Sequence, residues 1–132
     1  MKIVEVAVGI IKRGNKIYIS KRADELHQGG LWEFPGGKRE AHESLEQALA
    51  REMQEEIGIL VTSQSEFLLI KHDYGDKKVC LDVRLVDGFS GEPAHQEGQV
   101  SKWVDITTLD AFDFPAANQV IVEKLQGKFV NK

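Results

Sequence analysis

The segment from residue 44 to residue 59 restricts the fold most, because it has the marks of a well-bounded amphipathic helix. Ser44 and Gln47 match the capping-box pattern, in which two side chains and two backbone N–H groups bond reciprocally. Gly58 suits the left-handed residue that ends many helices. Four apolar residues recur at helical spacing and predict one buried stripe: Leu45, Ala48, Leu49 and Met53. Such a helix must pack its stripe against another layer.

The same helix carries three carboxylates on one patch, because Glu52, Glu55 and Glu56 stand at i, i+3 and i+4. Like charges at this spacing repel, and they occupy the last turn, where the helix dipole favours cations. A hard divalent cation would relieve both problems, and oxygen ligands select Mg²⁺, Mn²⁺ or Ca²⁺ over Zn²⁺. Just upstream, Gly36 and Gly37 allow close backbone approach and offer a carbonyl oxygen. From the spacing alone, the alternative is a solvated acidic face.

The rest of the chain reads as strands and one further helix. Alternating apolar residues on either side of a Gly-Asn turn predict a hairpin over residues 3–21. Residues 23–42 are Gly-rich and polar, and a loop of this length in a small domain is usually functional. The later elements predicted are strands over 67–74 and 79–86, a loop over 88–98, a strand over 100–104, and a helix from about Pro115 with Ala117, Val120, Ile121 and Leu125 facing inward. This order indicates a mixed sheet covered by helices in one domain, residues 1–132.

Composition excludes several classes of function. The single cysteine, Cys80, cannot form an internal disulfide and fits a reducing compartment. A net charge of −4 disfavours binding to a nucleic acid polymer, although it leaves room for one small anionic ligand. No apolar window reaches the length of a membrane span, and the first residues lack the apolar centre of a signal peptide. We therefore expect a cytoplasmic protein with no membrane partner.

Residues 37–59 match the Nudix box, G-x5-E-x7-R-E-U-x-E-E-x-G-U, where U is a bulky aliphatic residue. Every specified position agrees: Gly37, Glu43, Arg51, Glu52, Met53, Glu55, Glu56, Gly58 and Ile59. The chain thus resembles the Nudix hydrolases. The resemblance implies an α/β (α+β) Nudix fold, an α/β/α sandwich around a mixed sheet. It also implies Mg²⁺, with Mn²⁺ as a possible substitute, bound by Glu52, Glu55, Glu56 and the Gly36 carbonyl. Gly37, Glu43, Arg51 and Gly58 would be structural, with Glu43 and Arg51 paired to brace the helix.

Further segments resemble the MutT-type branch of that family. They are residues 7–11, 33–38, 91–93, 97–99 and 113–118, the last with Ala116 in place of one Pro. Position by position, this resemblance implies that Glu97 joins the metal shell. It also implies a set of substrate contacts: Arg22, His27, Glu33, Phe34, Pro35, Gly36, Lys77 and Asn118. Lys77 is a departure, because an Arg is expected there and a Lys lacks the planar, stackable fork.

The branch resemblance implies hydrolysis of oxidised purine nucleoside triphosphates, 8-oxo-dGTP to 8-oxo-dGMP and pyrophosphate, by a monomer that cleans the nucleotide pool. Catalysis would fall to Glu52, Glu55 and Glu97, with Glu52 or Glu97 as the general base and Glu52 favoured. One alternative is a pyrophosphatase for CTP or modified pyrimidine triphosphates. Another is a non-catalytic nucleotide sensor, a class that usually loses box carboxylates, whereas this chain keeps them all.

The contacts outside the box also have ordinary structural interpretations. Arg22 stands beside Lys21 and could be a surface cation, and His27 could be a solvated loop residue. Asn118 falls near a predicted helix start, where Asn commonly caps a helix. Its position within residues 113–118 is what favours a role in reading the base.

Overall fold

The computed structural model describes residues 2–22, 30–96 and 98–130. Its first two strands, β1 (Lys2–Arg13) and β2 (Lys16–Lys21), form the predicted antiparallel hairpin, with Lys12 opposite Ile17. Gly14 supplies the positive φ of 59° that this tight turn needs. The centre of β1, from Ala7 to Ile11, is buried, because the sheet is covered on both faces there.

The segment predicted as one long loop, residues 23–42, contains two short strands. β3 (Trp32–Glu33) pairs with β2, and β4 (Gly36–Lys38) pairs antiparallel with β1. The prediction missed them because two or three residues are too few to show alternation, and Gly usually weakens a strand. Here glycine permits the pairing, since a Cβ on Gly36 would collide with the backbone carbonyl of Ala7.

Helix α1 (Leu45–Ile57) matches its prediction in detail. Ser44 Oγ accepts from the backbone N–H of Gln47 at 3.1 Å, and Gln47 Oε1 accepts from the backbone N–H of Ser44 at 2.8 Å. Gly58 ends the helix at φ 72° and donates to the carbonyl of Gln54. The predicted stripe is buried, apart from the half-buried first residue, Leu45.

The next two strands are longer than predicted. β5 (Leu60–Asp73) begins seven residues before the predicted start at 67, and β6 (Lys77–Ser90) continues into the predicted loop. The pairing of β5 with β6 is irregular around Ser63 and between Glu66 and Leu68, so the apolar alternation that marks a strand is interrupted there. β6 runs parallel to β1, which makes the sheet mixed, in the order β3-β2-β1-β6-β5.

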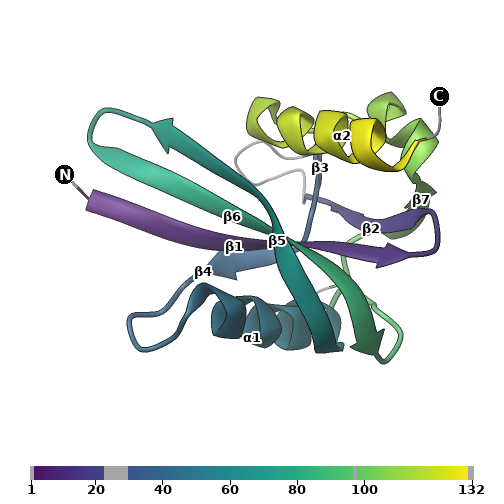
Figure 1. Ribbon diagram of the computed structural model, residues 1–132, viewed down its shortest axis with the longest axis horizontal. Coiled ribbons are helices and arrows are strands. Elements are labelled where there is room, and N and C mark those ends of the chain that lie inside the picture. The colour runs from purple at the N-terminus through teal and green to yellow at the C-terminus, as the bar shows by residue number, and fades with distance from the viewer. Residues whose placement is uncertain (1, 23–29, 97, 131–132) are drawn as a thin grey trace.

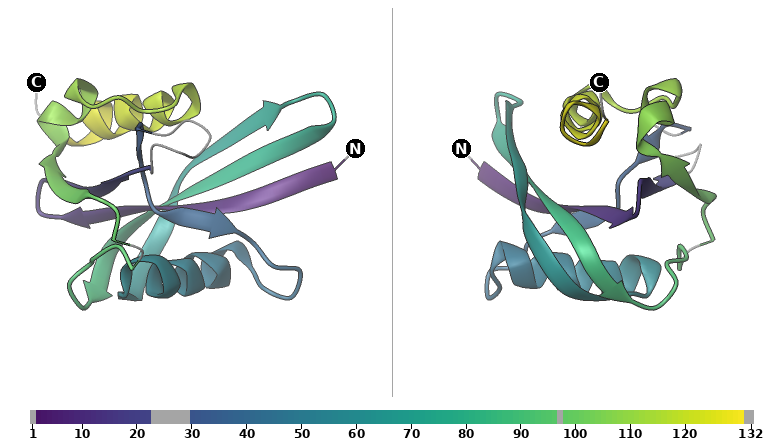
Figure 2. Two further views of the ribbon diagram at one scale, coloured as in Figure 1. Left: turned by 180° about the vertical axis from the view of Figure 1, so that it is seen from behind. Right: turned by 45° about the vertical axis from the view of Figure 1, so that its right-hand side comes forward.

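The C-terminal part comprises β7 (Ser101–Asp105), which pairs with β2, the 3-10 helix η1 (Ile106–Ala111) and helix α2 (Ala116–Phe129). Helices α1 and α2 lie on opposite sides of the strands (Figures 1 and 2). Each covers its own apolar cluster. The predicted α/β/α architecture with a mixed sheet is confirmed.

One inward-facing residue of α2 was predicted wrongly. Val120 is 45% exposed, whereas Ile121 and Leu125 are fully buried, as predicted, together with the nearly buried Val122. The helix begins at Ala116, and its buried stripe is formed by Ile121, Val122 and Leu125 and leaves Val120 outside it. In the part of the chain that the structure describes, no helix is long and apolar enough to cross a membrane.

Candidate active site

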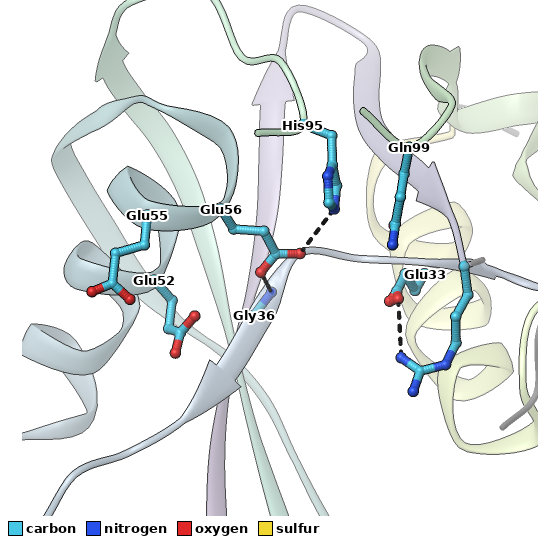
Figure 3. A pocket seen from close by; sticks show the side chains of 8 residues that line it. Glu33, Gly36, Glu52, Glu55, Glu56, His95 and Gln99 are labelled. Carbon is cyan, nitrogen blue, oxygen red and sulfur yellow. Dashed lines mark hydrogen bonds and ion pairs between the residues drawn. The ribbon is translucent and has the colours of Figure 1, made fainter. Parts of the chain in front are cut away.

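A hollow of about 340 Å³ opens beside the C-terminal end of α1 (Figure 3). It is lined by residues from four separate parts of the chain: Arg22, Glu33, Gly36, Glu52, Glu55, Glu56, His95 and Gln99. All of these except His95 and Gln99 were singled out in the sequence. The carboxylates from α1 form one wall, and Glu33 and Gln99 lie across from them (Figure 3).

Two glycines bring the backbone of β4 against this acidic wall. A Cβ on Gly37 would occupy the space of the Glu52 carboxylate, so a side chain at this position would displace that group. The N–H of Gly36 donates to Glu56 Oε2 at 3.2 Å. The Gly-Gly pair is therefore needed for close approach, and Gly36 presents its N–H to the site. The expected metal contact was through its carbonyl.

Arg51 joins the acidic residues around α1. Its guanidinium binds Glu43 through two nitrogens, Nε to Oε2 at 3.1 Å and Nη2 to Oε1 at 2.6 Å. Nη1 reaches Glu52 Oε2 and Glu55 Oε1, each at 3.1 Å, and Nη2 also donates to the carbonyl of Lys38. The pair expected between Glu43 and Arg51 is in contact, and it ties the start of the helix and the preceding loop to the helix's last two turns.

The electrostatics of Glu43 and Glu52 differ because of this arrangement. Glu43 is only 8% exposed, and the hydrogen bonds from Arg51 and from the backbone of Glu40 lower its pKa to about 2. In Glu52, loss of solvent around the half-buried carboxylate raises the pKa, and the opposing hydrogen bond from Arg51 does not cancel this effect. Glu43 is therefore suited to a permanent ion pair, and Glu52 is suited to accepting a proton.

The wall supplies the hard oxygen ligands that suit Mg²⁺. Within residues 2–22, 30–96 and 98–130, however, no three acidic or histidine side chains converge as metal ligands do. Glu52 and Glu55 are turned toward Arg51, while Glu56 accepts from Gly36. The chemistry of the donors fits a hard cation, and binding one requires Glu52 and Glu55 to turn from Arg51 toward Glu56. The fourth expected ligand, Glu97, lies outside the described residues.

The residues expected to contact the nucleotide are divided between the hollow and the core. Arg22 Nη1 lies 3.5 Å from Glu33 Oε1 at the hollow. Phe34 is buried beneath α2 and stacks on Phe114, with ring centroids 5.0 Å apart and planes 10° apart. Pro35 is buried too, and its carbonyl accepts from Gly9 at 2.8 Å. Phe34 and Pro35 therefore belong to the buried interior and do not line this hollow.

Two further expected contacts lie elsewhere. Lys77 begins β6 at the turn after β5, opposite Lys2 of β1, with its Nζ 5.9 Å from the centroid of the Tyr74 ring. Asn118 is the third residue of α2, and the N-cap position is held by Pro115. Asn118 is thus not the helix cap. Its side chain is half-buried. His27 lies outside those residues.

Sequence reasoning missed His95 and Gln99. Gln99 stands in the segment 97–99 that resembles the MutT-type branch, so the motif itself could have indicated it. His95 had no such signal, because it falls between the recognised segments 91–93 and 97–99. Its place in the site depends on how that loop packs against the end of α1.

Comparison with known proteins identifies the family. The family model of the NUDIX domain matches residues 6–124. The chain belongs to the Nudix family. It is 42% identical to the 8-oxo-dGTP diphosphatase of Escherichia coli K12 over 127 residues, 96% of this chain and 98% of that protein.

Two further comparisons bear on the branch of the Nudix family to which the chain is similar. The CTP pyrophosphohydrolase of Escherichia coli K12 is 36% identical over 117 residues, 89% of this chain and 85% of that protein. Among solved structures, a MutT structure from work on Aliivibrio salmonicida and Vibrio cholerae superposes with a TM-score of 0.88 at 42% identity. It covers 97% of this chain and 100% of that one. The predicted resemblance to the Nudix hydrolases and to MutT is confirmed.

Proposed function

We propose that this Nudix protein hydrolyses 8-oxo-dGTP to 8-oxo-dGMP and pyrophosphate and so removes an oxidised precursor from the nucleotide pool. The observation that carries the proposal is the hollow of this Nudix fold, which is lined both by the three carboxylates of α1 and by Arg22. The names of relatives support the substrate, since 8-oxo-dGTP diphosphatases of Escherichia coli, Haemophilus influenzae and Buchnera aphidicola are 38–42% identical over most of the chain.

The carboxylates of α1 provide the binding groups for Mg²⁺, or for Mn²⁺ in its place. Glu52, Glu55 and Glu56 would hold the cation, with Glu97 and the Gly36 carbonyl as further oxygen donors. When bound, the cation neutralises charge on the phosphate oxygens. Arg22, whose Nη1 lies 3.5 Å from Glu33 Oε1 at the hollow, would bind phosphate in place of that contact.

Of the two expected general bases, Glu52 and Glu97, the proposal assigns the activation of water to Glu52. The reaction needs a water oxygen to form a bond to phosphorus while the P–O bond between the α- and β-phosphates breaks. The water proton passes to a carboxylate. In the metal-free site, burial raises the pKa of Glu52 and makes its carboxylate a stronger proton acceptor, whereas a cation bound to the same carboxylate would lower that pKa again. Arg51 holds the same group at 3.1 Å and limits its orientations.

Selectivity for the oxidised base is assigned to Asn118. An 8-oxopurine carries a hydrogen-bond donor at N7, where guanine has only an acceptor. The Asn118 amide can accept from that N7–H and donate to O6. Guanine would place a lone pair against the amide oxygen, so the contact would become repulsive.

A specific observation favours a second candidate, a pyrophosphohydrolase for CTP, because a relative of that name is 36% identical over 117 residues. The test is product analysis with 8-oxo-dGTP, dGTP, CTP and 5-methyl-dCTP at equal concentration. We expect the highest kcat/KM with 8-oxo-dGTP and release of pyrophosphate. A preference for CTP would show that CTP is the substrate, and the assignment of the active site would stand. Nucleotide binding without turnover would indicate a sensor.

A further inference from the structure

The side chain of His95 lies against the carboxylate of Glu56. Its Nε2 is 3.8 Å from Glu56 Oε1, and the side chain is only 5% exposed. The other carboxylate oxygen, Oε2, accepts the N–H of Gly36 at 3.2 Å. The Glu56 carboxylate is therefore enclosed between the backbone of β4 and an imidazole ring, at the wall of the hollow (Figure 3).

The backbone on both sides of His95 is tied to the end of α1. The N–H of Ala94 donates to the carbonyl of Ile57 at 3.1 Å, and the N–H of Gln96 donates to the carbonyl of Glu56 at 2.9 Å. These carbonyls belong to the last turn of α1, where the helix has no donors left to offer. Residue 95 is thus held at a fixed place relative to the helix that carries the carboxylates.

The chain also leaves room for this contact at the helix end. A Cβ on Gly58 would lie 2.9 Å from the Gln96 side-chain nitrogen, which itself donates to the carbonyl of Ala94 at 2.9 Å. A residue other than glycine at this position would displace the exposed end of the Gln96 side chain and would be strained at the positive φ of 72°. Gly58 therefore provides the left-handed helix end and leaves space for the side chain of Gln96, next to His95.

We propose that His95 is a positioning residue for Glu56: its ring N–H holds the carboxylate in the orientation that binds a divalent cation. This inference rests on the proposed function of the same site. A neutral imidazole can donate through Nε2, and an approach of roughly 1 Å brings the pair to hydrogen-bond distance. Carboxylates that bind metals are commonly oriented by such donors, and loss of the donor costs about 10- to 100-fold in metal affinity.

The test is Mn²⁺ binding in the absence of nucleotide, measured by electron paramagnetic resonance of the free ion. His95→Leu keeps an apolar side chain in the packed position and removes the donor, whereas His95→Gln retains an N–H donor. We expect Mn²⁺ to bind about 10-fold or more weakly to His95→Leu, and His95→Gln to recover most of that loss. The matched control is His72→Leu, because His72 stacks on Tyr74 with ring centroids 4.3 Å apart and does not line the hollow.

Two results would overturn the assignment. One is unchanged Mn²⁺ binding by His95→Leu, and the other is an equal loss in His95→Leu and His95→Gln when both melt cooperatively. If His95→Leu does not fold, His95→Met takes its place with the same two outcomes. Glu56→Gln separates this inference from the proposed function. Unchanged Mn²⁺ binding there rejects the cation site itself. Weaker binding there, with unchanged binding in His95→Leu, rejects only the role of His95.

Discussion

The two halves of the candidate site are built in different ways. The acidic half comes from one continuous stretch, residues 36–56. Its side chains are held by Arg51 and by the backbone of Gly36, and the backbone of residues 94 and 96 bonds to the end of α1. The half expected to read the base draws on Phe34, Lys77 and Asn118, which lie on three separate elements. Only the first is fixed by packing, against Phe114.

This difference separates chemistry from selectivity. A local motif can define a metal-binding helix completely, because the spacing of the residues along the helix already places their side chains together. A base pocket assembled from distant elements can change one residue at a time, as with Lys77, without disturbing the acidic half. The same scaffold can therefore retain pyrophosphohydrolase chemistry while relatives differ in substrate, as the names of the two Escherichia coli relatives suggest.

The largest effect expected is that of removing metal, which tests the acidic half as a whole. Hydrolysis should disappear in EDTA and return with Mg²⁺ or Mn²⁺, because the carboxylates of α1 cannot themselves neutralise charge on a phosphate. Phosphate or pyrophosphate release measured before and after each addition checks this. Full turnover in metal-free buffer would leave the Glu patch as an ordinary solvated face.

The next largest effect is expected from Glu52→Gln, which keeps the size of the side chain and removes its charge and basicity. We expect kcat to fall by at least ~10²-fold, the low end for loss of a general base. Glu46→Gln is the matched control, because Glu46 is exposed in the first turn of the same helix. Equal rates for the two variants would exclude Glu52 from the chemistry. The melting temperature should stay close to that of the unaltered protein, since a like charge has been removed.

The sequence predicted the acidic half of this molecule well, and the reasons are physical. The capping box, the stripe and the glycine end of α1 depend on contacts within a few residues, and all are present. The hairpin of β1 and β2 was found for the same reason. β4 was missed because its pairing depends on a strand about thirty residues earlier, and no local alternation marks it.

The sequence predicted less about side-chain placement between distant segments. His95 joins the hollow because its neighbours bond to the end of α1, about forty residues earlier in the chain, and no motif includes it. Val120 was placed on the wrong face, since residues 120–122 are consecutive apolar residues and the sequence does not say which of them face the core. Asn118 is the third helical residue, so the helix-cap interpretation is wrong, while its role toward the base stays a prediction.

Asn118→Ala tests the half that reads the base. It should lower kcat/KM for 8-oxo-dGTP by about 5- to 150-fold, from a lost contact worth ~1–3 kcal/mol. Hydrolysis of dGTP should change much less, so the preference collapses. Stability should hardly fall, because Pro115 and not Asn118 occupies the N-cap. Val120→Ala, exposed on the same helix, is the control. An intact preference in Asn118→Ala would mean that other residues select the base.

The smallest effect concerns the ion pair between Glu43 and Arg51, which braces the acidic half. The bidentate contact with Arg51 lowers the pKa of Glu43 to about 2 in the folded state, below the ordinary 4.5 of an unfolded chain. A carboxylate with a depressed pKa stabilises the fold fully above its unfolded pKa, and this contribution is lost as pH falls from about 4.5 toward 2. Glu43→Gln removes that contribution at neutral pH.

We therefore expect Glu43→Gln to lower the melting temperature at pH 7, by an amount on the order of 5 °C. The difference in melting temperature between this variant and the unaltered protein should become smaller as the pH is lowered from 4.5 toward 2. Thermal melts of both proteins across this pH range measure that difference. Glu40→Gln is the matched control, because Glu40 is exposed and lies 3.4 Å from Arg51 without the bidentate geometry. A difference in melting temperature that does not depend on pH would show that Glu43 acts through its shape and packing. The charge of the Glu43–Arg51 pair would then not organise the acidic half.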